Sequence, residues 1–153
     1  MGYLSHEPLD VSALQTQVTK ADRGGIASFV GLVRNHQGGR TVAALAYSAY
    51  EPMAELVCAE IVAEAERRWP VRVALRHRLG ELAIGDPAVA VAAAGGHRDE
   101  AFAACRYVIE ELKRRVPIWK RETYADGSTV WVDPTTQGVA TSEERSGEAV
   151  GPV

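Results

Sequence analysis

The segment from Gly95 to Glu122 constrains the fold most, because it fixes a turn, a long helix and a following strand in one continuous run. A glycine pair precedes the predicted helix, and Pro117 ends it, since proline disfavours the helical conformation for the residue before it. Between these limits the apolar residues recur at helical spacing and form a single stripe: Ala101, Phe102, Cys105, Val108, Ile109, Leu112 and Val116. Such a helix is expected to pack this stripe against a sheet or another helix.

The rest of the chain alternates between strands and helices. Helical spacing predicts helices over residues 9–18 and 52–69. Runs of β-forming residues predict strands over 26–33, 42–50, 71–79, 88–94, 118–124 and 129–132. We expect strand 42–50 to return along strand 26–33, after a loop at residues 34–39. The order α, ββ, α, ββ, α, ββ predicts an α+β fold with mostly antiparallel sheets and packed helices.

Composition limits the chain to a single domain in a reducing compartment. Its 153 residues are 46% hydrophobic, which suits one domain over residues 1–134. Residues 135–153 are rich in Thr, Ser, Gly and Glu and predict a disordered tail. Cys58 and Cys105 fall within helical patterns and lack metal-ligand spacing, so no disulfide or zinc site is expected. With no signal peptide or membrane-spanning run, we expect a cytoplasmic protein that has no contact with a membrane.

Two groups of cations are candidates for binding a small anion. His97 and Arg98 begin the long helix, where free backbone N–H groups and the helix dipole favour anions. Arg34 follows a strand and could clamp an anion with two hydrogen bonds. The alternatives are that His97 is a loop histidine without a role and that Arg34 lies at a solvated hairpin tip. The net charge of -3 argues against a polyanionic partner, so no nucleic acid is expected.

Lys113 and Lys120 lie on either side of Pro117, and the helix-to-strand corner could direct both into one pocket. Lysine becomes an acid, a base or an imine former when burial or a neighbouring cation lowers its pKa. Three arginines are expected to supply such neighbours: Arg114, Arg115 and Arg121. The alternative is a set of solvated cations that offset the helix dipole. Lys120 lies beyond the helix and is not covered by that alternative.

Other residues indicate core positions rather than a cofactor site. His77 falls on the apolar face of strand 71–79 and is expected to be a core histidine. The chain contains no phosphate-binding loop, dinucleotide fingerprint, Ser-His-Asp set or metal motif, so no cofactor is expected.

Five ordered blocks of sequence resemble a known family. They are FVGLVRNH at 29–36, the Glu-Pro-Met helix start at 51–53, HRLGELAIGD at 77–86, GGHRDEAF at 95–102 and LKRRVPIWKRE at 112–122. Together they resemble the catalytic large subunit of molybdopterin synthase, over about residues 9–133. Five blocks in order are far more specific than any one of them.

The resemblance implies an α/β hammerhead-type fold and a homodimer within a heterotetramer. The implied partner is a small ubiquitin-like sulfur carrier, whose C-terminal Gly-Gly thiocarboxylate enters the pocket of the large subunit. The implied reaction places two sulfurs on cyclic pyranopterin monophosphate (precursor Z), a pterin, and so forms the dithiolene of molybdopterin. Because the carrier supplies the sulfur, no cysteine nucleophile and no cofactor are required.

The resemblance also assigns the candidate residues. Lys120 and Lys113 match the active-site lysines of the family, with Lys120 expected in proton transfer or a transient covalent role and Lys113 expected to position the thiocarboxylate and substrate. Arg34, His97 and Arg98 match its anion-binding pocket, within one chain or across the dimer interface. The competing hypothesis is a non-catalytic regulatory domain, in which the same cations bind a phosphorylated metabolite.

One position departs from the family pattern. Leu32 stands where a lysine is often found.

Overall fold

The computed structural model describes residues 2–133. The tail predicted for residues 135–153 lies outside this range and stays a prediction. The helices of the described part are α1 (Val11–Val18), α2 (Glu51–Arg68) and α3 (Arg98–Arg115). The strands are β1 (Leu4–Ser5), β2 (Gly25–Leu32), β3 (His36–Gln37), β4 (Arg40–Ala49), β5 (Val71–Arg78), β6 (Gly80–Leu82), β7 (Pro87–Gly95), β8 (Ile118–Tyr124) and β9 (Thr129–Val132). The predicted α+β class is confirmed, and β1, β3 and β6 are short strands that the sequence patterns did not reveal.

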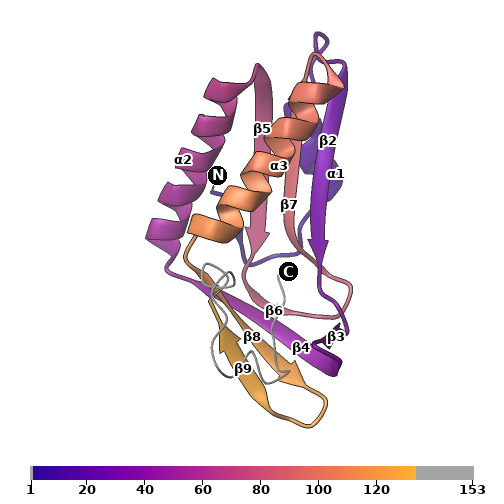
Figure 1. The fold of residues 1–153 in the computed structure, drawn as a ribbon, viewed down its shortest axis with the longest axis vertical. Coiled ribbons are helices and arrows are strands. Elements are labelled where there is room, and N and C mark those ends of the chain that lie inside the picture. Colours follow the sequence, from indigo (N-terminus) through magenta and orange to yellow (C-terminus); the bar gives the residue numbers. More distant parts are fainter. Residues whose placement is uncertain (1, 134–153) are drawn as a thin grey trace.

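The first sheet has the strand order β1-β5-β7-β2 and lies between helices (Figure 1). Its long strands are antiparallel, while β1 runs parallel to β5. α2 and α3 cover one face, and α1 packs on the other, where Leu14 and Val18 contact the alanines of β7. Because β7 is covered on both faces, it consists of small and β-branched residues, as a buried strand should.

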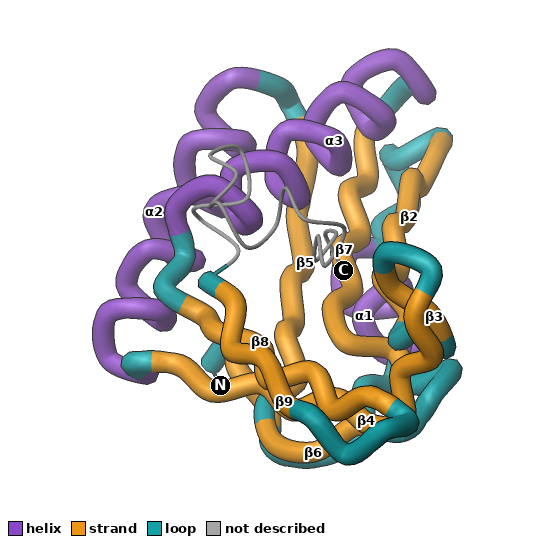
Figure 2. Tube along the Cα trace, turned by 60° about the horizontal axis from the view of Figure 1, so that its bottom comes forward, coloured by secondary structure: helices purple, strands orange, loops and turns teal. Residues whose placement is uncertain are grey.

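The second sheet has the order β3-β4-β8-β9, with β6 also paired to β4, and lies across one end of the first sheet (Figure 2). The prediction that β4 returns along β2 is wrong, because β4 pairs with β8. Gly38 and Gly39, with φ of 55° and 79°, turn the chain between β3 and β4, so that β4 returns along the short β3. Leu45 and Tyr47 of β4 are then buried with the inner face of β8.

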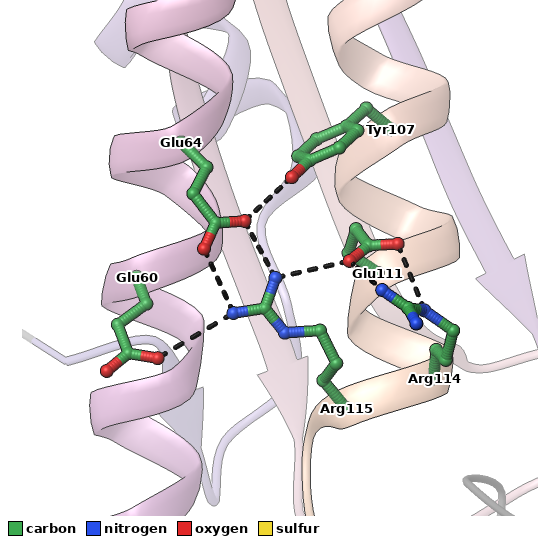
Figure 3. Close-up of polar contacts among 6 residues, drawn as sticks. All are labelled: Glu60, Glu64, Tyr107, Glu111, Arg114 and Arg115. Carbon is green, nitrogen blue, oxygen red and sulfur yellow. Dashed lines mark hydrogen bonds and ion pairs between the residues drawn. The ribbon is translucent and has the colours of Figure 1, made fainter.

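An ion-pair network holds the C-terminal end of α3 against α2 (Figure 3). Arg115 of α3 donates two hydrogen bonds to the carboxylate of Glu64 in α2, at 2.7 Å and 3.0 Å. Glu64 also accepts a 2.7 Å bond from Tyr107, and Arg115 contacts Glu111 at 3.2 Å. The hydrogen bond from Arg115, followed by that from Tyr107, lowers the pKa of Glu64 to about 2. The last turn of α3 is thereby fixed in place.

None of the helices in residues 2–133 is long and apolar enough to cross a membrane.

Candidate active site

Lys120 is buried on the inner face of β8. The strand alternates, so that Ile118, Lys120, Glu122 and Tyr124 all face inward, and Lys120 is only 2% exposed. In the β4–β8 ladder, Lys120 lies opposite Tyr47. Burial lowers the pKa of Lys120 to about 8, with Glu122 opposing this shift and Arg34 adding to it.

Lys113 reaches the same region from the last turn of α3. It is partly buried, and α3 ends at Arg115 so that the chain can turn at Pro117 into β8. Burial lowers the pKa of Lys113 to about 8, with further lowering by the positive charges of Lys120 and then Arg34. The structure therefore brings both predicted lysines together at the helix-to-strand corner.

Arg34 joins the lysines from the loop after β2. Its guanidinium donates a 2.7 Å hydrogen bond to Oε1 of the buried Gln37 in β3. Arg34 and Gln37 line a small cavity of about 20 Å³, together with Tyr47, Lys120 and Glu122. Arg34, Asn35 and His36 are exposed, as the alternative of a solvated tip expects, but the Arg34 charge lowers the pKa of both lysines.

Glu122 is the site residue that sequence reasoning missed. It is 2% exposed, burial raises its pKa, and the positive charges of Lys120 and Arg34 oppose that rise. Within the described residues, its Oε1 has no hydrogen-bond partner although it is buried. The signal was the spacing of Lys120 and Glu122, two positions apart on a strand, which places both on one face.

The structure places His97 and Arg98 elsewhere. Both are exposed at the start of α3, and Lys113 lies fifteen residues further along this helix. At about 1.5 Å of rise per residue, this separates Arg98 from Lys113 by roughly 22 Å. One chain therefore does not combine the two predicted groups in a single pocket.

The glycines before His97 have a structural reason. A Cβ on Gly95 would lie 2.6 Å from Cγ of Glu100, whose carboxylate accepts a 2.8 Å hydrogen bond from the backbone N–H of His97. The close approach that glycine permits is thus to the protein's own side chain, in the N-terminal capping interaction of α3.

The expected role of the neighbouring arginines is wrong. Arg114 and Arg115 bind Glu111 and Glu64, and Arg121 pairs with Glu81 while lying over the ring of Trp131. The cations that lower the pKa of Lys113 are instead Lys120 and Arg34. Each of the three neighbouring arginines is paired with a carboxylate in the folded chain. The order of residues around Pro117 does not reveal these pairs.

The cysteines lie in the helical core, as predicted. Cys58 in α2 and Cys105 in α3 are free and buried. Burial raises their pKa to about 12 and about 11, respectively. Both thiols therefore stay protonated at neutral pH, which makes them poor nucleophiles.

His77 is a core residue, also as predicted. It is 4% exposed, and its ring meets that of Tyr47 edge to face, with 4.8 Å between the ring centres. Burial lowers the pKa of His77 to about 4, so it is neutral at physiological pH.

Comparison with known proteins identifies the family. The family model described as "MoaE protein" matches residues 4–115. The molybdopterin synthase catalytic subunit of Synechococcus elongatus is 46% identical over 131 residues, which cover 84% of this chain and 79% of that protein.

Solved structures agree with this match. The X-ray structure of molybdopterin synthase from Staphylococcus aureus superposes with a TM-score of 0.82 at 35% identity, covering 86% of this chain and 96% of that one. A chain from the complex of subunits 1 and 2 of the molybdopterin-converting factor from Helicobacter pylori shares the fold, with a TM-score of 0.71 at 22% identity and coverage of 84% and 88%. The chain therefore belongs to the MoaE family of molybdopterin synthase catalytic subunits, which are sulfurtransferases of molybdenum cofactor biosynthesis.

Proposed function

We propose that this chain transfers sulfur from the thiocarboxylate of a small ubiquitin-like carrier to cyclic pyranopterin monophosphate, with Lys120 and Lys113 at the reacting centre. The observation that carries the proposal is the proximity of the buried Lys120 and the partly buried Lys113 to each other and to Arg34, where burial lowers the pKa of each lysine to about 8. Near neutral pH such lysines exist in both protonation states, so they can accept or donate a proton during turnover.

The reaction calls for cations at this point. Each carbon–sulfur bond forms as an oxygen leaves, and the cyclic phosphate of the substrate must open. Positive charges held in a partly dry pocket stabilise the negative charge that develops in both events. Lys120, the more buried, takes the proton-transfer or transient covalent role, while Lys113 positions the thiocarboxylate and the substrate.

A larger hollow offers a route to Lys113 for the carrier. It has a volume of about 510 Å³, lies between α3 and β2, and is lined by Phe29, Phe102, Ile109 and Lys113 among others. An extended Gly-Gly terminus is thin enough for such a hollow, and its terminal anion would meet the cation of Lys113. Main-chain pairing with a strand edge would add affinity. The Helicobacter pylori complex, which contains both subunits and shares this fold, supports a carrier as partner.

His97 and Arg98 require a second copy of the chain in this proposal. They lie roughly 22 Å from Lys113 along α3, by the rise of an α-helix. A homodimer would let them bind the phosphate and pterin end at the partner's lysines, and two carriers would complete a heterotetramer.

Mixing two inactive variants tests the shared site. Arg98→Ala and Lys120→Ala are each expected to be inactive, whereas refolded mixtures would contain dimers with one intact site and recover up to about a quarter of wild-type activity, by random pairing. A mixture as inactive as its components would refute the shared site without touching the role of the lysines.

The decisive assay mixes the purified chain with a thiocarboxylated carrier and precursor Z and measures molybdopterin. Lys120→Ala should lower the rate by ~10²–10⁴-fold, the usual cost of losing a positioned acid or base. Lys20→Ala removes an exposed lysine and is the matched control. No product with the wild-type chain would leave only the regulatory hypothesis. The compartment proposed for the reaction is the cytoplasm.

A further inference from the structure

A second small cavity lies beside Lys113 and is otherwise lined by buried residues. It has a volume of about 20 Å³ and is lined by three polar side chains, Tyr47 of β4, His77 of β5 and Lys113 of α3, among apolar neighbours. A cavity of roughly 10–15 Å³ or more holds one water molecule when two to four polar groups surround it. This cavity meets both conditions.

The hydrogen-bonding state of His77 follows from its contacts. Its Nδ1 lies 2.8 Å from the backbone carbonyl oxygen of Arg78, which can only accept, so Nδ1 carries the hydrogen and donates. Burial keeps the imidazole neutral by lowering its pKa to about 4. A neutral ring with its hydrogen on Nδ1 has a lone pair on Nε2, so His77 offers an acceptor.

The second polar group of the cavity is the hydroxyl of Tyr47. Within the described residues, its buried Oη has no hydrogen-bond partner, and burial followed by the charge of Glu122 raises its pKa. A phenolic hydroxyl buried without a partner costs free energy that a phenylalanine at this position would avoid. The same ring contacts His77 edge to face, and both residues line this cavity, while Tyr47 also lines the cavity beside Lys120.

We propose that His77 and Tyr47 are positioning residues for Lys113, acting through a single water molecule bound in this cavity. The water oxygen accepts hydrogen bonds from the Lys113 ammonium and the Tyr47 hydroxyl, and the water donates one hydrogen to Nε2 of His77. Donors and acceptors then balance without any charge transfer. The lysine is held from the core side while its other face serves the substrate pocket.

Neighbouring positive charges lower the pKa of Lys113, whereas a hydrogen bond to the water would raise it. Lys120 of β8 and Arg34 after β2 disfavour the ammonium, and Glu122 of β8 lies beside Lys120. A hydrogen bond accepted from the ammonium favours its charged form. Loss of the water or of its anchors should therefore lower the pKa of Lys113 further.

Three variants test the proposal, which rests on the proposed role of Lys113. Tyr47→Phe removes one oxygen atom and keeps the ring. His77→Asn places an amide N–H where Nδ1 lies and removes the Nε2 acceptor, whereas His77→Gln can place an acceptor near Nε2. The readouts are the NMR titration of Lys113 in the full chain, a high-resolution crystal structure of the cavity, and KM and kcat in the reconstituted reaction.

We expect an ordered water within hydrogen-bond distance of all three groups. Tyr47→Phe and His77→Asn should lower the Lys113 pKa by about half a unit or more and reduce kcat with little change in KM, while His77→Gln stays closer to wild type. A dry cavity, or an unchanged Lys113 titration in Tyr47→Phe, overturns the proposal. These two readouts need no turnover, so their failure is distinguishable from failure of the proposed function.

Discussion

The protonation of the two site lysines can be measured directly. An ordinary lysine has a pKa of about 10.4, so only about 0.1% is neutral at pH 7.5. With a pKa of about 8, roughly a quarter of Lys113 and of Lys120 would be neutral at that pH, an increase of about 200-fold. The cause is burial at the junction of α3 and β8, with Arg34 contributing to both shifts.

The chain is well suited to this assay because it contains only three lysines, Lys20, Lys113 and Lys120. In protein labelled with ¹³C-lysine, the Cε chemical shifts are followed from about pH 6 to about pH 11, which spans both expected ranges. The variants Lys113→Arg and Lys120→Arg each remove one signal and so assign the spectrum. Lys20 is exposed and provides the third signal.

Removing one cation then tests the cause. Arg34→Met should raise the pKa of Lys113 and of Lys120, because its charge lowers both. Arg121→Met is the matched control, since Arg121 pairs with Glu81 on the outside of β8. If both site lysines titrate near the ordinary pKa of lysine, the burial argument is refuted. If the pKa values of Lys113 and Lys120 are unchanged in Arg34→Met, the charge of Arg34 does not act on them.

The same shift predicts a pH dependence of stability. Lys120 has a lower pKa in the folded chain than in the unfolded chain, so the unfolded chain binds more protons between about pH 8 and pH 10.5. Stability should therefore rise with pH through this window, by ~3 kcal/mol at most for a shift of this size. Denaturation of wild type and Lys120→Met across the window isolates this contribution, and parallel curves would contradict it.

Two further predictions concern the scaffold. Arg115→Met should destabilise the fold by about 1–3 kcal/mol in urea denaturation, because it removes charge-assisted bonds to Glu64, and the loss should shrink as the pH falls from about 4.5 toward about 2, where Glu64 becomes protonated. Gly95→Ala should lower stability by about 1–3 kcal/mol, since its Cβ would lie 2.6 Å from Cγ of Glu100. Gly96→Ala is the milder control, because its Cβ would meet only Oε1 of Glu100, at 3.4 Å. Equal melting temperatures for the two variants would refute this explanation.

Local sequence patterns determined the secondary structure and most of the site residues. The strands over β5 and β8 and the end of α3 before Pro117 are short-range features, and the structure confirms each of them. The predicted apolar stripe of α3 is buried except at Phe102, which is 65% exposed. Lys113 and Lys120 were likewise identifiable, because their place beside a helix-to-strand corner is a local property. In the structure the charge of Lys120 acts on Lys113 and lowers its pKa, but the two lysines line separate cavities: Lys120 lines the one beside Arg34, and Lys113 lines the hollow between α3 and β2.

Only the tertiary structure decided which strands pair and which charges meet. β4 pairs with β8 rather than with β2, because strand pairing depends on which side chains are buried together. The order of strands along the chain does not determine this. The same pairing sets Tyr47 opposite Lys120 and brings Glu122 inside, while the length of α3 carries His97 and Arg98 away from the lysines. A pKa depends on burial and on charges within a few ångströms, so the reactivity of this pocket arises from packing rather than from the order of residues.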